Sequence, residues 1–280
     1  GKTPGRYANR IAGGHLDVLG NIYQLPINNG PNHLHGGPEG FQNQLWHLAE
    51  VGSKWVTFSL FSPDGDMGYP GNVIAVVEYW VDAEHRSIEI NYYAHSDRST
   101  MINLTNHTYF NLNGHDSGSV LGHELTLCAD RYYPTDPTLI PLEGFAYVEG
   151  TPMDFRQPKT LGRDIEADFP ALRYGKGYDS YWDWSDRDET KPVARLYGPA
   201  TGIVMEVDTD QRGLQVYTGN YLGGCPAGKG GARYEDYAGV ALECSDIPNG
   251  PNRIDGCPDL NAADFYIQSI TFTFSTDKTE

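Results

Sequence analysis

The sequence predicts an all-β fold, a large antiparallel β-sandwich with few short helices. Its 33 glycines and 18 prolines divide 280 residues into short segments, and its 19 tyrosines and 10 phenylalanines are residue types that strands favour. Apolar and polar residues alternate with a period of two in many segments, which is typical of half-buried strands. No repeat, low-complexity tract or linker-like change in composition interrupts the chain. We therefore expect residues 1–280 to form a single sandwich domain.

The alternation runs over the length of a strand in several segments, and turn-forming clusters separate them. The predicted strands are 55–60, 72–80, 87–94, 101–112, 213–222, 239–244 and 266–274. The clusters at 28–31 (Asn-Asn-Gly-Pro) and 62–66 are predicted turns. Helical candidates are few, and the clearest is a short one around 159–167.

The acidic charge of the chain limits its partners. Lysine and arginine number 20 against 37 aspartates and glutamates, which gives a formal net charge of −17. Nucleic acids and acidic membrane surfaces attract clustered basic residues, so we expect neither as a partner. A phosphorylated substrate would need a local basic pocket, and no apolar run is long enough to span a bilayer. A neutral small molecule is the expected ligand.

The cysteines are few and widely spaced, and no two have the Cys-x-x-Cys spacing. They are Cys128, Cys225, Cys244 and Cys257. This pattern suits neither a disulfide scaffold nor a zinc site, and it predicts reduced thiols in a cytoplasmic protein. The chain begins at Gly1 without a basic and apolar signal segment. Secretion with a removed signal peptide is the alternative.

The predicted strand 101–112 carries an unusual polar face. Alternation places Asn103, Thr105, His107 and Tyr109 on one face, with Asn111 beyond them, and a mainly apolar set on the other. An ordinary solvent-exposed face would carry lysines and glutamates instead. The polar row therefore predicts the lining of a wet, concave surface.

Two further strands add a carboxylate and an amide to such a surface. In 239–245, Glu243 shares its face with a glycine and an alanine, which leaves space beside the carboxylate. In 213–222, Gln215 and Tyr217 share one face. Sugar hydroxyls pair with amides and carboxylates, and sugar C–H faces lie on aromatic rings. The residues by themselves predict a carbohydrate-binding β-protein.

Each candidate also has an ordinary structural interpretation. His107 can be a structural hydrogen-bonding residue. Glu243 can form a salt bridge with an arginine, because an unpaired buried carboxylate is costly. Arg10 can be a surface cation, and Asp179 can be a turn residue. Residue chemistry alone leaves these alternatives open.

A metal site is the competing interpretation of the N-terminal histidines. His33 and His35, followed by Glu39, offer two imidazoles on one face and a carboxylate, which is part of the metal-binding pattern of cupins. A cupin also supplies a further histidine after a later Pro-x-Gly turn. The Pro-Ala-Gly sequence at 226–228 is followed by lysine and glycines, without that histidine. We therefore expect no metal.

Six motifs, in order along nearly the whole chain, resemble the successive signatures of the aldose 1-epimerase (galactose mutarotase) family. They are Gly5-Arg6-Tyr7-Ala8-Asn9-Arg10-Ile11, Asn32-His33-Leu34-His35-Gly36-Gly37, Asn103-Leu104-Thr105-Asn106-His107-Thr108-Tyr109-Phe110-Asn111-Leu112, Thr151-Pro152-Met153-Asp154-Phe155-Arg156, Gly213-Leu214-Gln215-Val216-Tyr217-Thr218-Gly219-Asn220 and Leu242-Glu243. One motif would be suggestive, whereas six in sequence are specific.

The resemblance implies a sandwich of the galactose mutarotase type that interconverts the α and β anomers of a neutral aldohexose by acid–base ring opening and closure. It implies Glu243 as general base and His107 as general acid. The substrate contacts that it implies are Arg10, His35, Asp179, Gln215 and Asn9. Nothing is oxidised in this reaction, so no cofactor is expected.

Two departures from the family's pattern fall beside these residues. Ser180 stands where the family usually has a histidine after the aspartate of its Gly-x-Asp motif. Cys244-Ser245 follows Glu243, where the family usually has Thr-Gln. The acid and the base are present, so the departures put in doubt the pocket shape and the sugar preference.

Two other functions stay open at this stage. A mutarotase-like lectin would bind sugar without turnover, and it is favoured only where the acid or the base is missing. A hexose-6-phosphate epimerase would need clustered arginines, and only Arg10 is placed near the other candidates.

The family normally carries several strands before the motif that here begins at Gly5. A sandwich without them would expose a strand edge or an apolar patch beside the Arg10 motif. We expect a missing segment or a partner chain to cover that edge, with a self-sufficient short form as the alternative.

Overall fold

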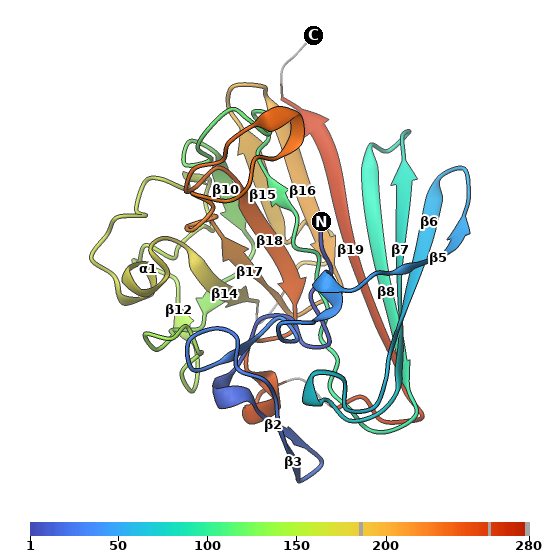
Figure 1. Ribbon diagram of the computed structural model, residues 1–280. Coiled ribbons are helices and arrows are strands. Elements are labelled where there is room, and N and C mark those ends of the chain that lie inside the picture. The colour runs from blue at the N-terminus through green and yellow to red at the C-terminus, as the bar shows by residue number, and fades with distance from the viewer. Residues whose placement is uncertain (185–186, 257–258, 278–280) are drawn as a thin grey trace.

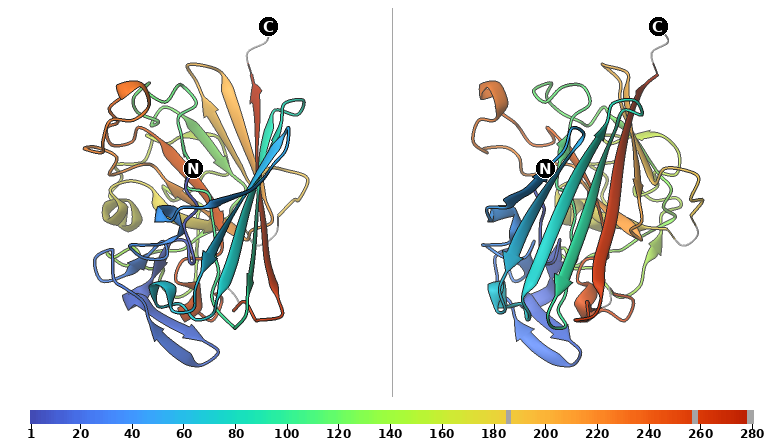
Figure 2. Two further views of the ribbon diagram at one scale, coloured as in Figure 1. Left: turned by 45° about the vertical axis from the view of Figure 1, so that its right-hand side comes forward. Right: turned by 90° about the vertical axis from the view of Figure 1, so that its right-hand side faces the viewer.

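The computed structural model describes residues 1–184, 187–256 and 259–277, and two large antiparallel sheets pack face to face in it (Figures 1 and 2). The nine-stranded sheet has the order β13 (Lys159–Thr160), β10 (Glu124–Leu127), β15 (Ala194–Gly198), β16 (Ile203–Thr209), β19 (Phe265–Thr276), β8 (Ser87–Ser96), β7 (Val73–Asp82), β6 (Trp55–Ser62), β5 (His47–Val51). The six-stranded sheet has the order β12 (Ala146–Tyr147), β11 (Arg131–Tyr132), β14 (Asp179–Asp183), β17 (Gly213–Tyr217), β18 (Val240–Ser245), β9 (Tyr109–Phe110). The predicted antiparallel β-sandwich is confirmed.

Smaller elements complete the fold. The remaining strands are β1 (Arg10–Ile11), β2 (His15–Val18), β3 (Asn21–Gln24) and β4 (His33–Leu34). The α-helix is α1 (Pro170–Gly175), and short 3₁₀ turns cover Ala12–Gly14, Phe41–Asn43, Asp66–Gly68, Lys229–Gly231 and Gly250–Asn252. Among the residues that the structure describes, no helix is long and apolar enough to cross a membrane.

The side chains of β18 alternate between the core of the sandwich and the outer face of the six-stranded sheet. Val240, Leu242 and Cys244 belong to the main apolar core between the sheets. Glu243 points to the opposite face of the sheet, as the sequence pattern predicts, yet its strand is buried along its whole length. A second layer of structure must therefore cover the outer face of the six-stranded sheet.

The N-terminal segment supplies this cover. It lies on the side of the molecule away from the nine-stranded sheet, blue in the left view of Figure 2. β1 pairs with β4, and Tyr7 forms a parallel bridge with Asn103. The Tyr7 hydroxyl donates to the carbonyl of Ile247 (2.6 Å) and accepts from the N–H of Gly250 (2.9 Å). These bonds fasten the segment to the loop that follows β18.

The predicted strand 101–112 is wrong over most of its length. Only β9 at its end is a strand, because the preceding backbone bonds to the N-terminal segment instead of a sheet neighbour: the N–H groups of Asn103 and His107 donate to Arg6 and Lys2. The predicted helix 159–167 is also wrong. Lys159–Thr160 is the edge strand β13, and the short α1 begins later, at Pro170. Pairing with β10 overrides the local helical preference.

The cysteines in the described part of the chain form no disulfide with one another. Cys128, Cys225 and Cys244 are free, and Cys257 lies outside the described residues.

Candidate active site

A polar pocket of about 310 Å³ lies on the outer face of the six-stranded sheet. Its volume is near the lower end of the range of about 300–1,000 Å³ that small-molecule sites occupy. It is lined by Asn9, Arg10, Asn29, Leu34, His35, His107, Tyr109, Asp179, Tyr217, Tyr221 and Glu243. The lining includes every residue predicted for the site except Gln215, which lies against Asp179 with its Nε2 donating to Oδ1 (2.6 Å).

Neighbouring strands of one sheet set the spacing of the polar groups. Gln215 on β17 stands directly opposite Glu243 on β18, and Asp179 on β14 stands opposite Tyr217. Residues paired in this way have Cβ atoms about 4.5–5.5 Å apart, so their side chains meet on the same face. The register of the sheet therefore puts the Gln215 amide and the Glu243 carboxylate in one row, and the Asp179 carboxylate in the next row on the same face.

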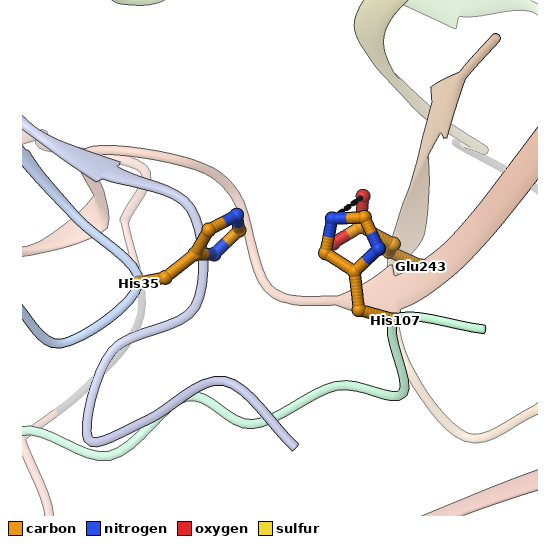
Figure 3. A group of neighbouring side chains, drawn as sticks. All are labelled: His35, His107 and Glu243. Carbon is orange, nitrogen blue, oxygen red and sulfur yellow. Dashed lines mark ion pairs between the residues drawn. The ribbon is translucent and has the colours of Figure 1, made fainter. Parts of the chain in front are cut away.

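Glu243 and His107 form an ion pair at the bottom of the pocket. Nε2 of His107 lies 3.5 Å from Oε1 of Glu243, and the two side chains are 16% and 4% exposed (Figure 3). Burial raises the pKa of the Glu243 carboxyl above its ordinary value, an effect that His107 and Arg10 oppose and Asp179 strengthens. A carboxylate with a raised pKa is a stronger base, which suits it to accept a proton.

His35 faces this pair across the pocket. Its ring centroid lies 5.4 Å from that of His107, in an edge-on arrangement (Figure 3). Burial lowers the pKa of His35 well below its ordinary value, and the positive charges of His107 and Arg10 act in the same direction. His35 is therefore a neutral imidazole beside the Glu243–His107 pair.

Arg10 is held inside the pocket and is not a surface cation. Its Nη2 lies 3.6 Å from Oδ2 of Asp179, and its Nε donates to Oδ1 of Asn29 (3.1 Å). One carboxylate oxygen of Asp179 therefore accepts a hydrogen bond from Gln215, and the Arg10 guanidinium lies near the other oxygen. Within the described part of the chain, Oε1 of Gln215 and Nδ1 of His107 are buried without a hydrogen-bond partner. A bound polyhydroxy ligand would supply partners for such groups.

Aromatic rings form one wall of the pocket. The His107 ring lies 5.0 Å from the Tyr109 ring, and Tyr109 lies 6.0 Å from Tyr217, centroid to centroid. Tyr221 adds a more exposed ring at the mouth. A sugar presents hydroxyls at its edge and C–H groups on its faces, and the pocket offers matching polar and aromatic surfaces.

Sequence reasoning missed Asn29 and Tyr221. Asn29 belongs to a cluster that predicts a turn, and this turn signal hides its contact with Arg10. Conversely, Asn103 and Thr105 were expected to line the pocket and do not. Oδ1 of Asn103 accepts from the N–H of Asp246, and the Thr105 hydroxyl donates to a carbonyl of β18, so both fix the backbone around the site.

The departures from the family pattern lie mostly behind the pocket. Ser180 and Cys244 are buried on the core face of their strands, opposite to Asp179 and Glu243. They can change the pocket through packing and not through direct contact with a ligand. Ser245 lies on the pocket face, where its hydroxyl donates to the carbonyl of Asp246 (3.1 Å).

The structure does not assemble the cupin-like set of His33, His35 and Glu39. Both ring nitrogens of His33 are already used, Nδ1 with the carbonyl of Pro26 (2.7 Å) and Nε2 with the hydroxyl of Tyr69 (2.8 Å). Glu39 is exposed at the surface. His33 therefore has a structural role, and His35 alone of this set reaches the pocket.

A larger hollow, of about 440 Å³, lies beside residues 150–164. Its buried cation, Lys159, donates to the carbonyl of Pro152 (2.6 Å) and to Asp164 (2.9 Å), so the fold already satisfies its charge. The smaller pocket contains the Glu243–His107 ion pair, a carboxylate and an imidazole whose spacing suits acid–base chemistry. Together with the sandwich fold, this arrangement is that of a candidate site for acid–base chemistry on a small polar ligand.

Comparison with known proteins narrows this class. The sequence profile of aldose 1-epimerase matches residues 1–273. Galactose mutarotase of Rattus norvegicus is 41% identical over 276 residues, which cover 98% of this chain and 78% of that protein. Aldose 1-epimerase of Haemophilus influenzae is 42% identical over 254 residues, 90% of this chain and 73% of that protein.

Comparison with solved structures points to the same family as comparison of sequences. A crystal structure of an aldose epimerase homologue from C. elegans superposes with a TM-score of 0.90 at 30% identity, over 99% of this chain and 83% of that one. Galactose 1-epimerase from Lactobacillus acidophilus gives 0.84 at 28% identity, over 99% and 80%. The chain belongs to the aldose 1-epimerase family and is an enzyme of the isomerase class.

Proposed function

We propose that this enzyme interconverts the α and β anomers of a neutral aldohexose of the galactose or glucose type, with Glu243 as base and His107 as acid. The interconversion of aldose anomers follows from the family. The assignment of residues rests on one observation: Glu243 and His107 lie 3.5 Å apart in a small polar pocket with an aromatic wall.

Ring opening needs one base and one acid. Glu243 takes the proton of the C1 hydroxyl, and the electron pair of that O–H bond forms the C1 carbonyl. The bond between C1 and the ring oxygen breaks, and the ring oxygen takes a proton from His107. Rotation about C1–C2 presents the other carbonyl face, and closure returns both protons. Each positioned proton-transfer group contributes about 10²–10⁴-fold.

The remaining pocket residues orient the sugar in this proposal. Arg10 and Asp179 hold each other, so together they present fixed donors and acceptors to vicinal hydroxyls. Gln215 keeps one amide oxygen available, and the buried Asn9 lines the pocket beside Arg10. Fixing the ring in this way lowers the entropic part of the barrier.

The pocket favours a neutral sugar over a sugar phosphate. Among the residues that line it, Arg10 is the arginine, and its guanidinium already faces Asp179. A phosphate group would meet a pocket that contains two carboxylates, Asp179 and Glu243. This electrostatic setting disfavours a dianion.

Polarimetry with freshly dissolved α-D-galactose and α-D-glucose tests the proposal. We expect optical rotation to reach equilibrium faster in proportion to enzyme concentration, and hexose 6-phosphates to be poor substrates. Tight sugar binding without any acceleration would show a lectin-like protein instead. Acceleration that is greatest with hexose 6-phosphates would move the assignment to a phosphate-specific epimerase.

We also propose that residues 1–280 act as one domain in the cytoplasm. One apolar core continues through both large sheets, which supports a single folding unit. Three free cysteines without a disulfide among the described residues support a reducing compartment.

A further inference from the structure

The pairing of β1 with β4 ends in an unusual hydrogen bond. Arg10 and Leu34 are the last pair of the ladder, and Asn9 and His35 are the residues directly beyond that pair. The N–H of His35 donates to the carbonyl of Asn9 (3.0 Å), as expected of a ladder. The N–H of Asn9, however, donates to the ring nitrogen Nδ1 of His35 (3.0 Å).

The backbone conformation of both residues makes this bond possible. Asn9 has φ of 67° and His35 has φ of 53°, which is the left-handed region. The side-chain Oδ1 of Asn9 accepts from the N–H of Arg10 (2.8 Å), a local bond that stabilises this conformation. Gly36 follows at φ of 78°, and a Cβ there would clash with the carbonyl oxygen of Gly5. The turn that presents His35 is therefore tightly specified.

A backbone N–H can only donate, so Nδ1 of His35 must offer its lone pair. In a neutral imidazole the proton then resides on Nε2. Protonating Nδ1 as well would place two N–H groups against each other. The cationic neighbours of His35, which are Arg10 and His107, also oppose its protonation, and so does His33 two residues away. Glu243 would favour protonation, but its carboxylate is paired with His107.

We propose that the backbone N–H of Asn9 locks His35 in its neutral Nε2–H tautomer, so that His35 is a permanent hydrogen-bond donor to the substrate and never the acid. Figure 3 shows the far edge of the His35 ring directed across the pocket toward His107. Asn9 is thus a positioning residue that acts through its backbone. This inference rests on the proposed function, because it divides the roles of the two histidines within that reaction.

The hydrogen bond from Asn9 to His35 also disfavours metal binding at this cluster. His35, His107 and Glu243 offer ligand atoms within 4.8 Å of one another, the residue set of many two-histidine, one-carboxylate metal sites. A metal-binding histidine offers a lone pair to the ion and donates its other N–H to an acceptor. His35 does the reverse, and Nδ1 of His107 has no acceptor among the described residues. The cluster is built for hydrogen bonding and not for a divalent ion.

His33 is a matched control in the same turn. The carbonyl of Pro26 can only accept, so Nδ1 of His33 must carry the proton. Nitrogen NMR of protein labelled with ¹⁵N-histidine distinguishes the two tautomers, and His35→Gln and His33→Gln assign the signals. We expect His35 to be neutral and protonated on Nε2 throughout the pH range in which an ordinary histidine titrates, and His33 to be protonated on Nδ1. A neutral His35 with the proton on Nδ1, or an imidazolium in that range, would overturn the proposal.

Zinc ion alone, added in equimolar amount to the same sample, provides a second readout. We expect the His35 and His107 signals to stay unchanged. A stoichiometric change in both signals, lost in His35→Gln, would contradict the lock.

Kinetics separates a donor from an acid. His35→Gln keeps a side-chain N–H donor, so we expect kcat within about 10-fold of wild type and an unchanged pH profile. His35→Leu removes the donor, and we expect a loss of about 100-fold or more. If His35→Gln instead abolishes the acidic or basic limb of the profile, His35 titrates in catalysis and the proposal fails. The NMR result does not depend on turnover, so failure of the proposed reaction would be recognised separately.

Discussion

Two buried carboxylates on the same face of the six-stranded sheet are held in different ways. Asp183, at the end of β14, accepts from Nε of Arg131 (2.8 Å), the hydroxyl of Tyr133 (3.1 Å) and Nη2 of Arg212 (3.3 Å). Glu243, two strands away, has His107 at 3.5 Å as its ion-pair partner in the described part of the chain. Both side chains are almost inaccessible to solvent.

The difference separates a structural acid from a reactive one. A buried carboxylate surrounded by donors is stable and has little capacity left for a ligand. A buried carboxylate with one distant partner costs stability and keeps its capacity to take a proton. If this comparison is correct, substitutions at the two positions will affect different measurable quantities.

The largest expected effect on rate is at the loosely held pair. Glu243→Gln and His107→Asn should each lower mutarotation by about two orders of magnitude or more, because each removes one proton-transfer group. Polarimetry on α-D-galactose measures the loss. Either variant within a few-fold of wild type would remove that residue from the mechanism.

The largest expected effect on stability is at the satisfied carboxylate. Asp183→Ala removes the carboxylate that Arg131 and Arg212 share, although Arg212 keeps Asp246 at 3.8 Å. We expect a loss of about 2–3 kcal/mol in the free energy of unfolding, less than for a fully buried pair because both arginines reach solvent. Denaturant unfolding measures this loss, and kcat should change by less than a few-fold. A variant of normal stability and low kcat would invert the comparison.

The pH dependence of stability sharpens the comparison at Glu243. Its pKa is raised in the folded state, so the folded protein binds more protons than the unfolded chain between the ordinary glutamate pKa of about 4.3 and the raised value. The contribution of Glu243 to stability therefore falls as pH rises through this interval. Glu243→Gln lacks this penalty. We expect the variant to exceed wild type in stability at about pH 7 by more than at about pH 4.

Denaturant midpoints for both proteins at the two pH values measure the difference. Asp183→Asn provides a control for the loss of a buried carboxylate elsewhere on the sheet. If wild type gains stability relative to Glu243→Gln on going to neutral pH, the fold stabilises the charge of Glu243 and the comparison is wrong.

The smallest expected effect is that of chelation. Exhaustive dialysis against EDTA should leave mutarotation unchanged, because His33 is committed to Pro26 and Tyr69 and His35 donates from Nε2. Polarimetry before and after dialysis measures it. Activity that disappears and returns with a divalent ion would revive a metal mechanism.

The sequence predicted best what depends on local alternation. Residues 72–80 and 87–94 were predicted as strands and match β7 and β8 to within two residues at each end, where apolar side chains face a large core. Glu243 was placed on the open face of its strand because only its neighbours in sequence decide that question. Where burial repeats every second residue, the pattern and the fold agree.

The sequence predicted less well what depends on distant backbone partners. Residues 101–108 alternate like a strand, but the N–H groups of Asn103 and His107 bond to the N-terminal segment, a pairing that periodicity cannot show. Asn29 has the composition of a turn, and its contact with Arg10 is visible only in three dimensions. The tautomer of His35 depends on one backbone N–H and on two left-handed residues, which composition does not reveal.

The hydroxyl of Tyr7 has a consequence for the order in which the molecule becomes active. It joins the beginning of the chain to a carbonyl 240 residues later, beside the strand that carries Glu243. Closing so long a loop is slow and entropically costly, so contacts of this kind form late in folding. The N-terminal segment is synthesised before β18 and must wait for that strand before it can make this contact. Catalytic competence should therefore be among the last properties that a nascent chain acquires, after most of both sheets can already have formed.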